Sequence, residues 1–371
     1  EEWKVMGLAA YGKFDRELYD LIRPLFKVVN GRMVSDSFRY YKKAFNKIWS
    51  MDKIRRHPSE SPLKAADLAY TGQKIFCEVV IEILSYLESL KVSKNLVLSG
   101  GCTLNSACNG LILDNVPFDK LYVPPAPSDD GNCIGAARLA YTEDHPDSIA
   151  NQKILSPYLG SEIRSDTMHR LNDFGHIKTI ALSPGEKLTD RIAKLISDGN
   201  IVGWIQGKAE FGPRALGNRS ILADPRSPQM KERINAEIKF REAFRPFAPS
   251  ILHEFGHEYF ENYQESPYME RTLRFRHEVR NKVPAVVHED GTGRLQSVKR
   301  EWNETYYDLI YAFYRQTGVP ILLNTSFNIM GKPIVHSVED ALAVFFTSGL
   351  NVLVVGDKIF IKSGSSNGVS R

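Results

Sequence analysis

The chain has 371 residues, of which 43% are hydrophobic and 25% are charged. This composition is ordinary for a soluble globular protein, and the length suffices for two domains of about 100 to 200 residues each. The longest uncharged apolar stretch, residues 341–356, is interrupted by Thr347, Ser348, Gly349 and Asn351, which excludes a membrane-spanning helix there.

The net charge of +4 is concentrated in one window of the sequence. Residues 206–245 hold nine Lys or Arg and five Asp or Glu, and the rest of the chain balances 39 against 39. A local basic cluster in an otherwise neutral protein predicts an anionic small molecule, such as a phosphate compound, and argues against a nucleic-acid partner. None of the four cysteines shows CxxC spacing, so we predict a reduced, cytoplasmic compartment. The interrupted apolar stretch at residues 341–356 predicts no membrane partner.

The first 150 residues alternate helices with strands. A long helix is expected after Ser61-Pro62, followed by a buried strand, NLVLSGG, and a helix over residues 105–113. A second strand, LYVPPAP, leads into the acidic turn SDDG and another helix, NCIGAARLAY. This order predicts an α/β layer with its ligand at the carboxyl ends of the strands. Residues 36–60 are expected to be a surface insertion.

A polar, proline-containing stretch between residues 145 and 158 predicts a domain boundary. The division is therefore 1–150, 155–365 and a disordered tail, 366–371. In the second domain, helices are expected over 186–197, 228–238, 253–263, 304–316 and 337–347. Strands are expected at IVGWI, RPFAPSIL, VPILLNTSF, VLVVGD and KIFIK.

Three segments of the second domain predict an anion site. FGPRALGNRS contains Arg214 and Arg219 on a glycine-flanked loop, and KFREAFRPFAP contains Lys239, Arg241 and Arg245. LNTSFN places Ser326 and Asn328 at the end of an apolar strand, and GTGR adds Arg294, expected on a surface turn. Arginine forks bind phosphate oxygens through two hydrogen bonds, and several together stabilise charge on a phosphoryl group. The alternative is a solvated basic surface.

In the first domain, Gly100-Gly101 follows a strand and Asn105 opens the next helix, as in a nucleotide cradle. A plain tight turn explains the two glycines equally well. Asp129 at another strand end could bind a metal or cap the following helix. The HExxH pattern from His253 to His257 would suggest a zinc protease, but Gly256 weakens the required helix and no third ligand follows at suitable spacing.

Seven motifs, taken together and in this order, resemble the O-carbamoyltransferases that modify nodulation factors and antibiotics. They are KVMGLAAYG, LSGGCTLN, PPAPSDDG, FGPRALGNRSILADPR, KFREAFRPFAPSIL, DGTGRLQSV and LLNTSFNIMGKPIV. The resemblance implies an α/β protein: the C-terminal part of an actin-like (ribonuclease H-like) carbamoyl-transfer domain, then a twisted-sheet domain similar to threonylcarbamoyl-adenylate synthases. It further implies that the second domain forms carbamoyl-adenylate from carbamoyl phosphate and ATP with Mg²⁺. The first domain would pass the carbamoyl group to a hydroxyl of a small acceptor, a sugar or a natural product.

Carried over residue by residue, the resemblance assigns an adenylate-forming site and a transfer site. The expected catalytic residues are Arg214, Lys239, Arg241, Arg245, Arg294 and Ser326. Nucleotide binding is expected at Gly100, Gly101, Asn105, Arg219 and Asn328, and metal binding at Asp129.

One departure from the family concerns the metal. The family holds iron or another divalent transition metal with an HxxxH pair upstream of the part that this chain represents, and the HxxxH present here lies in the second domain. The chain also begins at Glu1 without an initiator Met, so it is expected to be a fragment that lacks its natural N-terminus.

Two other readings remain open at this point. The first is an RNA-binding module related to threonylcarbamoyl-adenylate synthases, which would require an extended basic stripe with exposed aromatic residues. The second is an actin-like sugar kinase, which would require phosphate-binding strands at its N-terminus.

Overall fold

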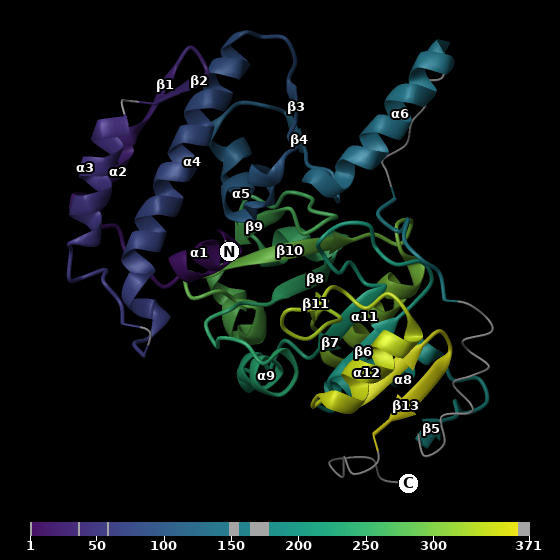
Figure 1. The fold of residues 1–371 in the computed structure, drawn as a ribbon. Coiled ribbons are helices and arrows are strands. Elements are labelled where there is room, and N and C mark those ends of the chain that lie inside the picture. The colour runs from purple at the N-terminus through teal and green to yellow at the C-terminus, as the bar shows by residue number, and fades with distance from the viewer. Residues whose placement is uncertain (1, 36–37, 58, 148–155, 164–177, 363–371) are drawn as a thin grey trace.

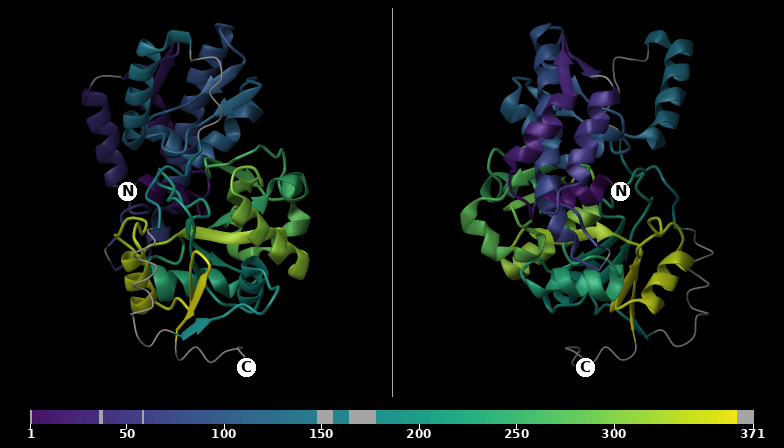
Figure 2. Two further views of the ribbon diagram at one scale, coloured as in Figure 1. Left: turned by 90° about the vertical axis from the view of Figure 1, so that its right-hand side faces the viewer. Right: turned by 60° about the vertical axis from the view of Figure 1, so that its left-hand side comes forward.

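The computed structural model describes residues 2–35, 38–57, 59–147, 156–163 and 178–362. The predicted boundary between residues 150 and 155 and the predicted disordered tail, 366–371, lie outside the described residues. Figures 1 and 2 show an N-terminal part, residues 2–147, stacked on a C-terminal part, residues 156–362, which contains the large sheet.

The N-terminal part consists of helices around two small sheets. The helices are α1 (Glu2–Ala9), α2 (Arg16–Ile22), α3 (Phe38–Trp49), α4 (Ala66–Ser89), α5 (Ser106–Asn115) and α6 (Asn132–Asp144). The strands are the antiparallel pair β1 (Phe26–Val29) and β2 (Arg32–Ser35) and the parallel pair β3 (Asn95–Val97) and β4 (Lys120–Tyr122). A small core forms where Leu84 of α4 and Ile112 of α5 meet Leu96 and Leu121 of the strands. In contrast, α6 stands apart in Figure 1, and none of its residues is buried.

The C-terminal part is built on one mixed sheet of nine strands, in the order β5-β13-β12-β6-β7-β11-β8-β10-β9. Its strands are β5 (Lys178–Ile180), β6 (Val202–Ile205), β7 (Arg219–Ala223), β8 (Ala248–Leu252), β9 (Arg271–Arg274), β10 (Thr292–Val298), β11 (Ile321–Ser326), β12 (Val352–Val355) and β13 (Lys358–Ile361). Its helices are α8 (Leu188–Ser197), α9 (Gln229–Ile234), α10 (Gly256–Tyr259), α11 (Glu304–Thr317) and α12 (Val338–Thr347). The neighbours β12/β6 and β10/β8 are parallel, and the other neighbours are antiparallel.

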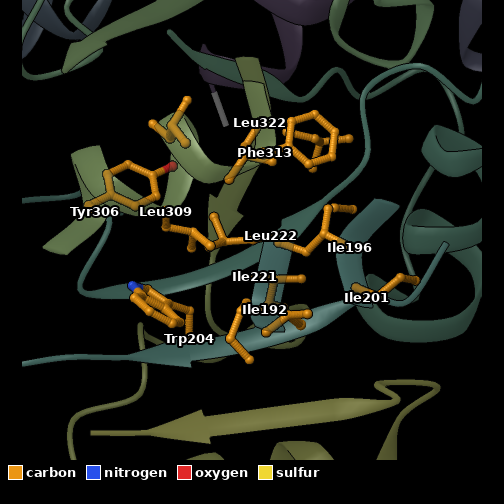
Figure 3. Close-up of a cluster of buried hydrophobic side chains, with 14 of the residues drawn as sticks. Ile192, Ile196, Ile201, Trp204, Ile221, Leu222, Tyr306, Leu309, Phe313 and Leu322 are labelled. Carbon is orange, nitrogen blue, oxygen red and sulfur yellow. The ribbon is translucent and has the colours of Figure 1, made fainter. Parts of the chain in front are cut away.

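The main hydrophobic core lies between this sheet and the packed pair α8 and α11. Figure 3 shows Ile196 of α8 and Phe313 of α11 against Leu222 of β7. Every residue of β6, β7, β8 and β12 is buried, as expected for central strands covered on both faces. Trp204 also satisfies its indole N–H, which donates to the carbonyl of Gly217 at 2.9 Å.

The two parts meet where α5 covers the edge strand β9. Gly110 is required there, since a Cβ atom at this position would lie 2.0 Å from the carbonyl oxygen of Thr272. Asn109 donates to the carbonyl of Glu270 at 2.9 Å, and Thr272 donates from its hydroxyl to Ser106 at 3.0 Å. Covering an edge strand with a helix satisfies backbone groups that would otherwise be open to pairing.

The α/β class and the large second sheet are as predicted. Several helices match their expected ranges within two residues, α8, α11 and α12 among them. The helix expected over 253–263 is wrong, because that segment is a 3-10 turn and the short α10, ended by extended backbone at Phe260. Strand β10 was not expected, and Arg294 lies within it rather than on a surface turn. Among the described residues, no helix is both long and apolar enough to cross a membrane.

Candidate functional site

Seven of the predicted site residues come together at one place in the C-terminal part. They are Arg214, Lys239, Arg241, Arg245, Arg294, Ser326 and Asn328, called here the basic cluster. Arg214 lies on the loop between β6 and β7, and Lys239 ends a π-helical turn that follows α9. Arg241 and Arg245 lie on the loop before β8, and Ser326 and Asn328 lie at the end of β11 and just after it. The sheet order places β11, β8 and β10 side by side, which explains why these distant segments converge.

Lys239 is the most deeply buried member of the cluster, with 2% of its surface exposed. Its ammonium group donates to both oxygens of Asn328, at 2.7 Å for Oδ1 and 3.1 Å for the carbonyl, and also to the carbonyl of Ser326. The next residue, Phe240, has the left-handed conformation at φ 47°, which a non-glycine side chain rarely adopts. A π-turn followed by such a residue is a strained arrangement of the kind that occurs at functional sites.

Arg241 and Arg245 are held on the loop by neighbours on both sides. Arg241 Nε donates to Asn235 Oδ1 at 2.7 Å, and its guanidinium lies 4.8 Å from the ring centre of Phe247. Arg245 lies 4.3 Å from the ring centre of Trp3, a residue of the N-terminal part. The guanidinium groups are therefore fixed in place before any ligand binds.

The cluster carries an excess of positive charge. Burial holds the pKa of Arg294 well below the usual range, and the charges of Arg214, Arg241 and Arg245 add to the effect. Burial lowers the pKa of Arg241 to about 9, with the Arg245 charge adding to the effect. The carboxylate of Glu242 opposes this, yet it is shared between Arg245 and Lys4. Like charges held together without water are destabilising, so this arrangement favours an anion with several negative charges.

Arg219, predicted beside Arg214, is not part of the basic cluster. It is 1% exposed, and its two Nη atoms donate to four backbone carbonyls at 2.7 to 3.1 Å. The accepting residues are Gln206, Asn218, Ser161 and Gly207. Arg219 therefore has a structural role, because it holds four backbone carbonyls together.

The predicted cradle of the N-terminal part lies on the loop between β3 and α5. Gly100 has φ 102° and Gly101 begins a 3-10 turn. Asn105 caps α5 by accepting from the Cys108 amide at 3.0 Å, and it exchanges two hydrogen bonds with Gln73. The amide of Asn105 is thus already engaged, while the two glycines are exposed. Arg214 Nη2 lies 3.5 Å from the carbonyl of neighbouring Leu104, so the loop approaches the basic cluster.

Asp129 has no further metal ligands beside it among the described residues. It is exposed at the start of a 3-10 turn after β4. Within the part of the chain that the structure describes, no group of three His, Cys, Asp or Glu side chains could hold a metal ion. A tight transition-metal site needs three or four protein ligands, so these residues do not fit iron or zinc.

A small cavity of about 60 Å³ lies between α1, α5 and strand β10. Arg294 lines it together with three residues that the sequence did not suggest: Tyr11, Lys231 and His288. Tyr11 belongs to the motif KVMGLAAYG, which pointed to no role at this site, and Lys231 and His288 belong to none of the seven motifs. Their meeting has no local signal, because they come from segments far apart in the chain.

The hydrogen bonds around His288 show which of its ring nitrogens carries a proton. The Thr292 hydroxyl donates to Asp290 Oδ1 at 2.7 Å, so at 3.1 Å it must accept from His288 Nδ1. The ring is neutral at pH 7 because burial lowers its pKa, and Nε2 is then a buried acceptor that has no hydrogen-bond partner among the described residues. The pKa of His288 is lowered to about 4, mainly by burial. The charges of Arg294 and Lys231 also lower it, whereas the charge of Asp290 raises it.

We expect His288 to make the protein less stable in acid. An unfolded histidine binds a proton near pH 6.5, whereas the folded one does so only near pH 4. Between these values the unfolded state holds more protons, so the free energy of unfolding should fall as pH falls, by about 1.4 kcal/mol per pH unit from this residue. Denaturant unfolding from pH 7 to 4 should show that His288→Asn removes this part of the slope. An unchanged slope would contradict a neutral His288.

Comparison with known proteins identifies the family to which these residues belong. Residues 1–138 match the family model described as Carbamoyltransferase N-terminus, and residues 193–362 match Carbamoyltransferase C-terminus. The chain is 38% identical to nodulation protein NolNO of Sinorhizobium fredii, over 99% of this chain and 54% of that protein. It is 37% identical to NolO of Bradyrhizobium diazoefficiens, over 99% of this chain and 66% of that protein. An uncharacterised protein of Methanocaldococcus jannaschii, MJ1051, is 32% identical over 98% of this chain and 69% of its own length.

These matches confirm the resemblance drawn from the motifs. The chain spans about half to two thirds of the length of the curated relatives that it matches. Among solved structures, full-length HypF in its phosphate- and nucleotide-bound form overlaps with a TM-score of 0.31 and 14% identity, covering 50% of this chain and 22% of that one.

Proposed function

This chain belongs to the carbamoyltransferase family, and from that premise we propose that it catalyses the adenylate-forming step of an ATP-dependent O-carbamoyl transfer. The observation that carries the proposal is the convergence of the seven cluster residues, five of them cationic, around Lys239 and Arg294. Such a cluster suits two anionic substrates that must be brought together, ATP and carbamoyl phosphate.

The chemistry requires a carbamate oxygen to attack the α-phosphorus of ATP. Water first splits carbamoyl phosphate into carbamate and phosphate. The new bond joins the carbamate oxygen to the α-phosphorus, and the bond to the β-phosphate oxygen breaks, so pyrophosphate leaves with its electron pair. Arg241, Arg245 and Arg294 bind phosphate oxygens and stabilise the charge that builds on the leaving group. Lys239 holds Ser326 and Asn328 at the end of β11, where their side chains complete the site.

The transfer step would follow in the N-terminal part. There, Gly100 and Gly101 offer exposed backbone to a nucleotide, and the acceptor would be a hydroxyl of a sugar or natural product. We assign no step to a transition metal, since Asp129 lacks companion ligands among the described residues. Mg²⁺ would arrive with ATP, where it supplies charge neutralisation of the phosphates. An activated carbamoyl-adenylate hydrolyses readily, which favours passing it directly between adjoining parts of one chain.

We expect the full chain to release pyrophosphate from ATP when carbamoyl phosphate and Mg²⁺ are both present. A coupled pyrophosphate assay should show one phosphate per pyrophosphate, and no release when carbamoyl phosphate is omitted. Absence of release from folded, monodisperse protein would contradict the proposal. The same preparation can be titrated with structured RNA, where binding that ATP does not affect would favour the RNA-binding alternative. Burial of Lys239 weighs against that alternative, because RNA contacts need exposed cations.

A further inference from the structure

The motif KVMGLAAYG, at the start of the chain, is not used by the chemistry above. Helix α1 and Tyr11 come from this segment, and the structure places them against the loop of residues 240–247 that carries Arg241 and Arg245. Two parts of the chain separated by more than 200 residues therefore meet at the basic cluster.

The first contact is made by the beginning of α1. The Trp3 ring lies over the guanidinium of Arg245 at 4.3 Å, and the Lys4 ammonium lies 3.1 Å from Glu242 Oε1. Trp3 is 45% exposed, so its outer face is open to solvent while its inner face covers the arginine. A cation held on an aromatic face keeps its charge and loses freedom of movement.

The second contact is made by Tyr11. Its hydroxyl donates to the Phe244 carbonyl at 3.3 Å and accepts from the Lys231 ammonium at 3.0 Å. Its ring meets Phe244 edge to face, with centroids 6.4 Å apart. One side chain thereby joins α9 to the loop, and it lines the same cavity as Arg294.

Gly12, the last residue of the motif, fixes the direction from which Tyr11 approaches. A Cβ atom at Gly12 would lie 2.0 Å from the carbonyl oxygen of Ala66, at the start of α4. The backbone of the motif is therefore pressed against the longest helix of the N-terminal part, which gives Tyr11 a rigid base.

The loop needs such support because of its own composition. Residues 240–247 form no helix or strand. The loop begins at the left-handed Phe240, and it carries two arginines whose charges repel each other. A loop of this kind would otherwise sample many conformations, and only some would direct both guanidiniums at one ligand.

We propose that Tyr11 and Trp3 are positioning residues of the adenylate-forming site, which hold the loop of residues 240–247 in its anion-binding conformation. The proposal rests on the proposed function for its substrates. It makes the N-terminal part a component of the site in the C-terminal part, in addition to its own expected role in transfer. Neither residue touches the reacting atoms, so their effect should fall on binding.

The test uses the full chain with Tyr11→Phe, which removes one hydroxyl, and Trp3→Ala, which removes one aromatic face. The matched controls are Tyr86→Phe and Trp49→Ala, at an exposed tyrosine and an exposed tryptophan of the same part. Calorimetric titration with inorganic pyrophosphate should give a Kd raised about tenfold in each test variant and unchanged in each control. In the pyrophosphate-release assay, the KM for carbamoyl phosphate should rise by a similar factor, with kcat reduced much less.

Trp3→Phe retains an aromatic face and should recover most of the affinity, which a loss of general stability would not predict. Wild-type affinity in both Tyr11→Phe and Trp3→Ala would overturn the proposal. If the wild-type chain binds pyrophosphate but shows no release from ATP, the proposed function fails. A loss of pyrophosphate binding in the variants would then still support the positioning role.

Discussion

Replacing Arg294 with methionine should reduce pyrophosphate release at least about 100-fold, while the melting temperature stays level or rises. The loss follows from removing a donor that we propose faces the developing charge, a change that typically costs about 10² to 10³ in rate. The stability follows from the surroundings of Arg294, whose strongest neighbours are arginines of the same charge. Among the described residues its buried Nε has no hydrogen-bond partner, so methionine removes a destabilising charge and keeps most of the volume.

A buried arginine next to it in the sheet provides the control. Arg271 lies on β9 and pairs with Leu295 of β10, the strand that also carries Arg294. The Nε atom of Arg271 is 3.8 Å from the carboxylate of Glu270. Arg271 also donates to Gln264 at 3.0 Å and to the Leu121 carbonyl. Arg271→Met would leave the buried carboxylate of Glu270 without its cationic partner, although its hydrogen bonds from Ser266 and Tyr268 would remain, and losing such a partner costs about 3 to 5 kcal/mol. Thermal melting of the two variants should therefore move in opposite directions. A large drop for Arg294→Met with activity retained would show that Arg294 is structural.

The contrast between these two arginines shows what the sequence could not supply. Nothing in the sequence indicated that Arg271 and Arg294 lie on neighbouring strands, and Arg294 was expected on a turn. It lies in a strand because β9 pairs with residues 292–295 and β8 pairs with residues 296–298 of β10, and such pairing is a long-range effect. The strands β6, β11 and β12 were predictable, because each contains a run of apolar residues, which is a local signal in the sequence.

The candidate site divides in the same way. The motifs indicated which residues to consider, and seven of them, five cationic and two neutral, meet in the structure. The sequence treated Arg214 and Arg219 alike, yet the first reaches the cluster from a loop and the second opens β7 among backbone carbonyls. Tyr11 and Lys231 are 220 residues apart, so their contact has no signature in either segment.

Changing Lys239 to methionine should reduce the rate of pyrophosphate release about 100-fold or more. It should also lower the free energy of unfolding by about 1 to 3 kcal/mol. Its ammonium group satisfies the carbonyls of Ser326 and Asn328 as well as the Asn328 side chain, and methionine cannot donate to any of them. The segment after β11 should then lose its position, and with it Ser326 and Asn328.

Because the variant is expected to be both less stable and inactive, it needs a control that separates the two effects. Lys362 makes similar contacts but is not a member of the basic cluster, since its ammonium donates to the carbonyls of Phe345, Phe346 and Ser348 at 2.7 to 3.3 Å. Lys362→Met should lose comparable stability in denaturant unfolding and keep its catalytic rate well below its melting temperature. If Lys362→Met loses activity to the same extent, the effect of Lys239→Met comes from stability. If it does not, the ammonium group of Lys239 is required where ATP and carbamoyl phosphate are proposed to react.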